Sequence, residues 1–185
     1  MRIIAGAFKS RTLVAPPGSN TRPTTDRARE TLFNVLTNLI DFSDIRMLDL
    51  FAGSGAVALE AISRGAGHAT LIEQDRKAVH VVKENIRMLG VEEKVTVIFS
   101  DVFNYLKYPP SAKFDLIFAD APYNDKRALE ELPSIIILNK WLTPNGICVI
   151  EHRSLQGINM VLPQGAKIIR ELKAGEAAFT ILQYA

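Results

Sequence analysis

Residues Met47 to Gly55 read M-L-D-L-F-A-G-S-G and place the tightest constraint on how this chain can fold. The apolar run that begins at Ile45 ends in a glycine-rich turn, and an alanine-rich segment of helical character, residues 56–64, follows at once. A strand, a glycine turn and a helix start in direct succession are typical of a nucleotide-binding corner. We expect Gly53 and Gly55 to let the backbone turn tightly and to let a ligand come close without a Cβ in the way.

Two kinds of ligand fit this corner. Gly53, Gly55 and Ala58 match the dinucleotide fingerprint G-x-G-x-x-G/A, and Glu73 follows at roughly the 20 residues that place an acid on a ribose. Asp49 separates the two ligands, because a carboxylate repels a pyrophosphate but suits a cationic amine or sulfonium. S-adenosylmethionine (SAM) carries both cations, so Asp49 favours SAM. A buried Asp that only caps the helix or satisfies loop N–H groups stays open as an alternative.

The composition is that of one globular domain. The chain has 185 residues, 48% of them hydrophobic and 23% charged, which is ordinary for such a domain. No apolar run approaches the ~20 residues of a membrane helix, and the N-terminus lacks the apolar stretch of a signal peptide. The single cysteine, Cys148, lies in an apolar run and is expected in the core, and no Cys/His cluster suggests a metal. We therefore expect a cytoplasmic protein.

The positive charge is concentrated near the N-terminus. The net charge of the chain is +2, yet residues 1–30 hold six basic side chains against two acidic ones. This basic arm predicts a phosphate-contacting surface, with an ordinary solvated edge as the alternative. The candidate contacts are Arg2, Lys9, Arg11 and Arg22. Two β-like runs, residues 2–5 and 12–15, predict a small hairpin within the arm.

A helix is expected directly after the arm. Pro23 ends the preceding segment, and Thr24, Thr25 or Asp26 can cap the helix that follows. Thr24 lies at this capped start and is also a candidate contact for the cofactor. The predicted apolar face consists of Ala28, Leu32, Val35, Leu36 and Leu39. We divide the chain into an N-terminal appendage, residues 1–23, and a main domain, residues 24–185.

Strands and helices alternate from residue 45 onward. The predicted strands are 45–50, 69–73, 94–99, 114–119 and 145–151, and the predicted helices are 56–64, 75–89, 102–107 and 126–139. This alternation predicts an α/β fold with a parallel sheet covered on both faces. The last two apolar runs, 166–172 and 177–184, predict a hairpin, so the sheet should be mixed at that edge.

Four acids lie at or just beyond the carboxyl ends of the predicted strands: Asp49, Glu73, Asp101 and Asp120. Ligands of open α/β sheets bind beyond the carboxyl ends of the strands, so these acids should lie together. Glu73 can accept the hydroxyls of a ribose and Asp101 an adenine amino group, with Val102 or Phe103 covering the ring and Phe51 beside the glycines. Each acid has an alternative role as a helix cap, and Asp101 looks like an N-cap.

The sequence Asp120-Ala121-Pro122-Tyr123 is the second strong signal. An amino group on an aromatic ring is a poor nucleophile because its lone pair is delocalised into the ring. Two acceptors aimed at its N–H bonds help it to become tetrahedral. Asp120 and the carbonyl of Ala121, held extended by Pro122, can supply this pair, and Tyr123 can stack on the base. An ordinary turn at a strand end is the alternative.

The two motifs together resemble the amino-directed SAM methyltransferases, whose hallmark is [D/N]-P-P-[Y/F/W]. The opening G-x-x-K-S-R-x-L-x-x-P and the string R-P-T-T-D-R-A-R-E-T-L-F-N-V-L look like the RsmD family, along essentially the whole chain. The resemblance implies a Rossmann-like, seven-stranded mixed sheet with the last strand antiparallel. It also implies methylation of a guanine N2 in small-subunit ribosomal RNA, with SAM contacts at Asp49, Gly53, Gly55, Glu73 and Asp101 and base contacts at Asp120, Pro122 and Tyr123.

One residue departs from the hallmark, since Ala121 stands where the first proline is usual. The carbonyl acceptor survives, so we expect activity to be retained with a looser loop. Other substrates stay open at this point: an adenine N6 in DNA, a protein amide, or none for a non-catalytic SAM-binding module. A nicotinamide oxidoreductase leaves D-A-P-Y unexplained. We expect a monomer that acts on an assembled or assembling small ribosomal subunit. His152, after the fifth strand, is a weaker candidate to face the RNA.

Overall fold

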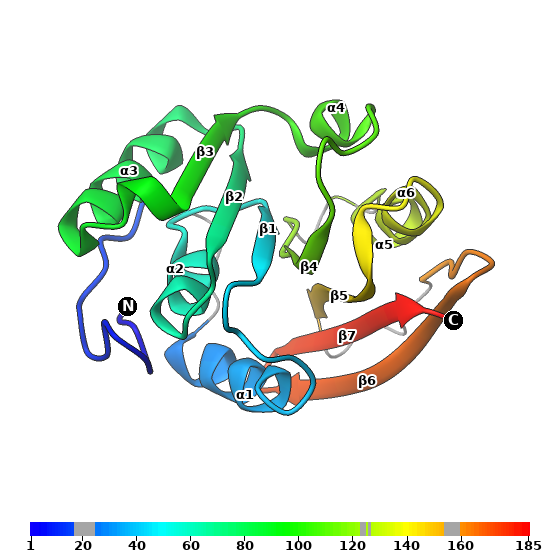
Figure 1. Ribbon diagram of the computed structural model, residues 1–185, viewed down its shortest axis with the longest axis horizontal. Helices are drawn as coiled ribbons and strands as arrows, with labels where there is room; N and C mark the ends of the chain where they lie inside the picture. The colour runs from blue at the N-terminus through cyan, green and yellow to red at the C-terminus, as the bar shows by residue number, and fades with distance from the viewer. Residues whose placement is uncertain (17–24, 123–124, 126, 154–159) are drawn as a thin grey trace.

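The computed structural model describes residues 1–16, 25–122, 125, 127–153 and 160–185. A seven-stranded sheet in the order β3-β2-β1-β4-β5-β7-β6 forms its centre (Figure 1). The strands are β1 (Arg46–Leu50), β2 (His68–Glu73), β3 (Val95–Phe99), β4 (Phe114–Ala119), β5 (Leu142–Arg153), β6 (Ala166–Ala174) and β7 (Ala177–Tyr184). Strands β1 to β5 pair in parallel, whereas β7 is antiparallel to both β5 and β6. The predicted mixed sheet with an antiparallel last strand is confirmed.

Helices cover both faces of this sheet (Figure 1). They are α1 (Asp26–Leu36), α2 (Ala56–Ser63), α3 (Arg76–Leu89), α4 (Val102–Leu106), α5 (Arg127–Glu130) and α6 (Leu132–Leu138), with a 3-10 turn at Glu92–Lys94. Successive strand residues point to opposite faces, so Met47 packs in the cluster with α2 and α3, and Leu48 in the cluster with α4 and α6. None of the helices in the described ranges is long and apolar enough to cross a bilayer.

Two predicted helices differ from those observed. The segment 126–139 was expected as one helix, but α5 and α6 are separate and Pro133 lies in the first turn of α6. Proline lacks the N–H that a helix interior needs, so it fits only at a helix start. Helix α1 ends at Leu36, which leaves Leu39 beyond it and 38% exposed, and Phe33 joins the buried face instead.

The N-terminal arm folds as a small hairpin that docks on α2. An antiparallel bridge joins Arg2 to Thr12, and the Leu13 N–H donates to the Met1 carbonyl at 3.0 Å, so the predicted hairpin is confirmed. The arm's backbone also donates to α2, where the Phe8 N–H bonds the Ser63 hydroxyl at 2.9 Å. A Cβ on Gly6 would lie 1.8 Å from the Ser63 carbonyl oxygen, so only glycine allows this close approach. Two arm residues, Ile3 and Leu13, complete the core beside α2.

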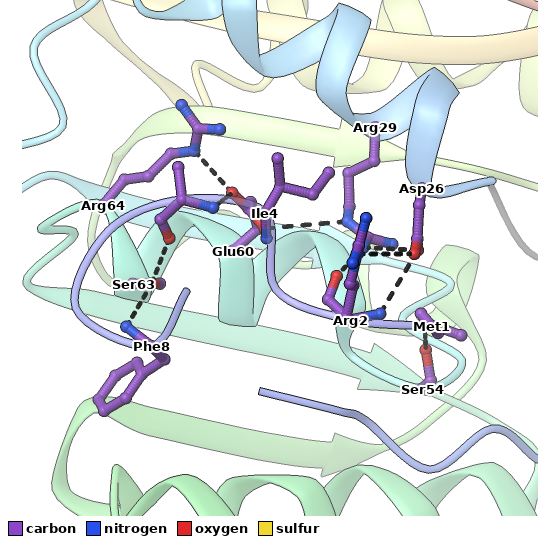
Figure 2. A network of polar contacts seen from close by, with 11 residues as sticks. Met1, Arg2, Ile4, Phe8, Asp26, Arg29, Ser54, Glu60, Ser63 and Arg64 are labelled. Atoms are coloured by element: carbon purple, nitrogen blue, oxygen red, sulfur yellow. Dashed lines mark hydrogen bonds and ion pairs between the residues drawn. The ribbon is translucent and has the colours of Figure 1, made fainter. Parts of the chain in front are cut away.

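Glu60 of α2 is the anchor for this docking (Figure 2). Its carboxylate is fully buried and accepts hydrogen bonds from the N–H groups of Ile4, at 2.7 Å, and Ala5, at 3.0 Å. It also forms ion pairs with Arg64, at 2.8 Å, and with the buried Arg29 of α1, at 4.0 Å. Arg29 in turn donates to the Arg2 carbonyl and, at 3.0 Å, to Asp26. One buried carboxylate therefore joins the arm, α1 and α2.

We expect the substitution Glu60→Gln to lower the free energy of unfolding by about 3 kcal/mol, because it removes the buried carboxylate beside the guanidinium of Arg29 and leaves that buried cation with the partly exposed Asp26. The Gln amide would also place N–H groups against the arm's own N–H donors. Urea unfolding followed by circular dichroism measures the change.

The matched control is Glu30→Gln on the exposed side of α1, which should change the free energy of unfolding by no more than ~0.5 kcal/mol. A loss below ~1 kcal/mol in the Glu60 variant would show that the network contributes little net stability.

Candidate active site

The carboxyl ends of four neighbouring parallel strands bring the predicted acids to one edge of the sheet. The strand order β3-β2-β1-β4 places Asp101, Glu73, Asp49 and Asp120 side by side in that sequence. Asp49 is level with Leu71 on one side and Phe118 on the other. Strand β1 lies between β2 and β4, so the connections that follow β1 and β4 diverge from each other at this point. Ligands of open α/β sheets bind at such a switch point. We call this edge the carboxyl edge.

The glycine-rich loop after β1, residues 51–55, turns with three residues of positive φ: Phe51 at 68°, Gly53 at 56° and Gly55 at 76°. A Cβ on Gly53 would meet nothing within 4 Å, which agrees with the predicted open approach for a ligand. A Cβ on Gly55 would instead lie 2.5 Å from Cγ2 of Val82. Glycine is therefore needed at position 55 for α3 to pack against the loop, which is a reason that the sequence did not reveal.

Asp49 lies beneath this loop, only 2% exposed, with one carboxylate oxygen that has no hydrogen-bond partner among the described residues. Burial raises the pKa of its carboxyl well above the ordinary value; the backbone N–H of Ala58 in α2 opposes the rise, and the charges of Asp120 and Glu73 add to it. A buried acid beside two further acids gains most from a cation. The alternative role of Asp49, which is to cap the following helix, is supported by its hydrogen bond from the Ala58 N–H. That role does not account for Oδ2, which has no hydrogen-bond partner among the described residues.

Glu73, at the end of β2, stabilises the glycine-rich loop after β1 by a hydrogen bond. One carboxylate oxygen accepts from the Gly53 N–H at 2.7 Å, and the other accepts from the N–H groups of Gln74 and Asp75, both at 2.8 Å. A carboxylate can accept about four hydrogen bonds, so the capacity that remains for a ribose is limited. The sequence did not reveal this second task, because it depends on a contact between β2 and the loop after β1.

Asp101 caps α4, as one of its predicted roles required: its side chain accepts from the Asn104 N–H at 2.9 Å. Val102 is 3% exposed and packs in the core, whereas Phe103 is half-buried and carries the Arg127 guanidinium 4.4 Å from its ring centre. Of the two residues expected to cover a ring, Phe103 is the more accessible.

We call residues 120–125, which follow β4, the target loop. Asp120 and Pro122 are half-buried and Ala121 is 8% exposed, while Tyr123 lies outside the described residues. The Asp125 N–H donates to the Pro122 carbonyl at 2.8 Å, which closes a turn. Asp125 also pairs with Arg127 at 2.9 Å, so a chain of contacts runs from the target loop through Arg127 to the Phe103 ring. This pair was not predicted from the sequence, although an Asp just before a helix is a capping signal.

The structure separates the basic residues of the arm. Arg2 is close to the start of α2, with its side chain 68% exposed and 3.8 Å from Asp26. Lys9 lies in the turn that docks beside Ser63 at the other end of α2, about 12 Å away for a helix of eight residues. Arg11 is exposed, and Arg22 and Thr24 lie outside the described residues.

Two further predictions concern the core. Cys148 is buried, which raises the pKa of its thiol to about 12, as expected for a residue that only packs. The suggestion that His152 faces an RNA is wrong: the ring is 5% exposed and its Nε2 lies 3.0 Å from the hydroxyl of Thr180 on β7. The antiparallel strand β7 covers it, and only the sheet topology reveals that.

The α/β sheet, the glycine loop after β1 and the acids at the ends of β1 and β2 define a Rossmann-like class I SAM-dependent methyltransferase. The orphaned oxygen of Asp49 and the open space at Gly53 fit a cationic cofactor. A family model described as "Conserved hypothetical protein 95" matches residues 1–183, and the chain belongs to this family, the RsmD family.

Relatives and solved structures agree with this assignment. "Ribosomal RNA small subunit methyltransferase D" of Escherichia coli is 37% identical over 99% of this chain and 89% of its own length. The solved structure of the Escherichia coli protein yhhF is 35% identical, covers 100% of this chain and 97% of its own, and has a TM-score of 0.84. SMU.776, solved with S-adenosylhomocysteine bound, is 15% identical over 83% of this chain and 48% of its own, and its TM-score of 0.66 reflects a shared fold.

If Asp49 binds the cofactor's cations, Asp49→Asn should weaken SAM binding by about 10- to 100-fold, because it removes the negative charge expected to face them. The folded-state pKa of Asp49 is raised, so the unliganded protein gains stability as pH falls and bears the full cost of the buried charge above that pKa. The variant should therefore be at least as stable as the parent at neutral pH. Titration calorimetry and thermal unfolding measure both effects.

The pH dependence sharpens this test. SAM affinity of the parent should fall as pH is lowered through the raised pKa of Asp49, whereas the affinity of the Asn variant should change little with pH. Asp41→Asn, at an exposed carboxylate remote from the site, is the control and should behave as the parent. Equal pH profiles in the parent and the Asp49 variant would remove Asp49 from cofactor binding.

Proposed function

We propose that this protein transfers a methyl group from SAM to the exocyclic N2 amine of a guanine in small-subunit ribosomal RNA. The observation that carries the proposal is the position of Asp120 and Ala121, one strand away from Asp49, at the carboxyl edge. The near-full-length relative named as a ribosomal RNA small-subunit methyltransferase supports the substrate class.

The residues of the target loop match what this reaction needs. The Asp120 carboxylate and the Ala121 carbonyl each accept an N–H of the guanine amine, so that the nitrogen lone pair turns toward the methyl group. Pro122 holds Ala121 extended, and Tyr123 stacks on the base. SAM supplies a methyl already activated on a sulfonium. The new N–C bond forms as the C–S bond breaks, the sulfur keeps the electron pair, and the nitrogen gives up one proton, which Asp120 is placed to receive.

The remaining acids and the loop hold the cofactor in this proposal. Asp49 faces the amine and sulfonium, Glu73 the ribose, and Asp101 the adenine amino group, with Phe103 beside the ring. The other assigned contacts are Phe51, Gly53, Gly55, Val102 and Thr24. Since methyl transfer from an activated donor relies mainly on positioning, these contacts and the two acceptors account for most of the catalysis.

The RNA lies across the carboxyl edge and reaches the arm. Arg2, exposed at the start of α2, is the basic arm residue nearest the site among those described, and Lys9, Arg11 and Arg22 extend the phosphate-contacting surface. The arm of residues 1–23 is thus the RNA-contacting unit and residues 24–185 the catalytic domain. A short arm reads little sequence by itself, so we infer that a monomer acts in the cytoplasm on an assembled or assembling small subunit.

The decisive experiment combines the protein with isotopically labelled SAM and small ribosomal subunits from cells that lack this gene. The RNA is then digested and its nucleosides are identified by mass. Label in N2-methylguanosine is the expected result. Label in another nucleoside would overturn the guanine assignment, and no label on subunits, naked RNA or DNA would favour a non-catalytic SAM-binding module.

Asp120→Ala should reduce the single-turnover rate of methyl transfer by about 10²- to 10³-fold, since one of two acceptors at the reacting nitrogen is lost. SAM affinity should stay within about threefold of the parent. Glu130→Ala, on the exposed side of α5, serves as the control. An unchanged single-turnover rate would remove Asp120 from the catalytic role.

Ala121→Pro restores the usual hallmark and should raise kcat by about two- to fivefold, because a more restricted loop holds its two acceptors in the reactive geometry for a larger fraction of the time. Steady-state kinetics on the same ribosomal particles measures the effect. A kcat below that of the parent would contradict a loosened target loop.

A further inference from the structure

Asn85 of α3 is a fully buried polar residue whose hydrogen bonds join three separate segments. Its Oδ1 accepts from the Val14 N–H at 2.8 Å, and its Nδ2 donates to the Val14 carbonyl at 3.0 Å. Nδ2 also donates to the carbonyl of Ser54 at 2.9 Å. Both donor hydrogens of the amide are thus engaged. Asn85 connects α3 to the second strand-like segment of the arm and to the glycine-rich loop after β1, residues 51–55, which we call the cofactor loop.

Ser54 receives a second link from the arm. Its hydroxyl lies 3.3 Å from the sulfur of Met1 (Figure 2). The two ends of the arm are themselves adjacent, because the Leu13 N–H donates to the Met1 carbonyl at 3.0 Å. Ser54 lies between Gly53 and Gly55, so the arm contacts the loop there directly through Met1 and indirectly through Asn85.

The loop needs such support. Phe51, Gly53 and Gly55 all have positive φ, and a non-glycine residue in that conformation persists only where its surroundings fix it. The loop's own bonds hold its two flanks: the Gly53 N–H reaches Glu73, and the Gly55 N–H reaches the Ala52 carbonyl at 2.8 Å. The carbonyl of Ser54, between those flanks, is held by Asn85.

We propose that Asn85 is a positioning residue that couples docking of the N-terminal arm to the shape of the SAM-binding loop. Coupling between two sites is reciprocal, so SAM binds more tightly when the arm is docked, and the arm is held more firmly when SAM is bound. Because the arm displays Arg2, contacts that RNA makes with the arm are transmitted to the cofactor site. The proposal rests on SAM binding alone and is independent of which base is methylated.

The test uses Val14, whose side chain is 37% exposed and whose N–H is the donor to Asn85. Val14→Pro removes that N–H without touching the loop, and Val14→Ala keeps it. Calorimetry with S-adenosylhomocysteine should show a loss of at least about fivefold in affinity for the Pro variant, the lower end of typical couplings, and no more than about twofold for the Ala variant. Hydrogen exchange of arm amides should slow on ligand binding in the parent and the Ala variant only.

Asn85→Asp is the second variant. It keeps an acceptor for the Val14 N–H but sets an oxygen against the Val14 and Ser54 carbonyls, so its affinity should fall at least as far as that of Val14→Pro. Asn38→Asp, on an exposed turn after α1, is its control. Thermal unfolding without ligand shows whether each variant is folded.

Two results would overturn the proposal. One is a folded Val14→Pro variant that binds S-adenosylhomocysteine as tightly as Val14→Ala. The other, which needs no variant, is arm hydrogen exchange in the parent that does not respond to S-adenosylhomocysteine. Neither measurement involves methyl transfer, so failure of the guanine assignment and failure of this coupling are distinguishable.

Discussion

The burial of Glu60 is the constraint on which most of this structure depends. All eight residues of α2 are buried, and an ionised carboxylate in that position is tolerable only if it is paired and hydrogen-bonded. The arm supplies two N–H groups, and Arg29 and Arg64 supply the charge. The arm, α1 and α2 are therefore held in fixed positions relative to one another, and the cofactor loop, which leads directly into α2, is held with them.

A second electrostatic condition operates at the carboxyl edge. Asp49, Asp120 and Glu73 are close enough for the charges of the latter two to raise the pKa of Asp49. This concentration of negative charge costs free energy in the unliganded protein and is relieved by a ligand with two cationic centres. The same condition disfavours a dinucleotide, whose pyrophosphate would meet the Asp49 carboxylate. The charge of the site therefore favours SAM over a dinucleotide, whereas the glycine-rich loop fits both.

The chain resembles its solved Escherichia coli relative over its whole length. The loop after β4 contains a feature that departs from the family hallmark. Ala121 replaces the first proline of the hallmark, while the turn that follows is closed by the bond between Asp125 and Pro122. Arg127 then connects this turn to the ring of Phe103 in α4. These contacts restrict the turn after Pro122 and leave Ala121 without the restraint that a proline would give.

The sequence alone determined the α/β order, the glycine corner, the acids at the strand ends and the cap at Asp101, because each depends on neighbours within a few residues. The tertiary structure decided the rest. Glu60 sits in an apolar helix whose pattern does not reveal its partners, Gly55 is explained only by Val82 of α3, and Asn85 only by Ser54 and Val14. Such contacts join residues far apart in the chain, where local periodicity and propensity carry no information about which groups will meet.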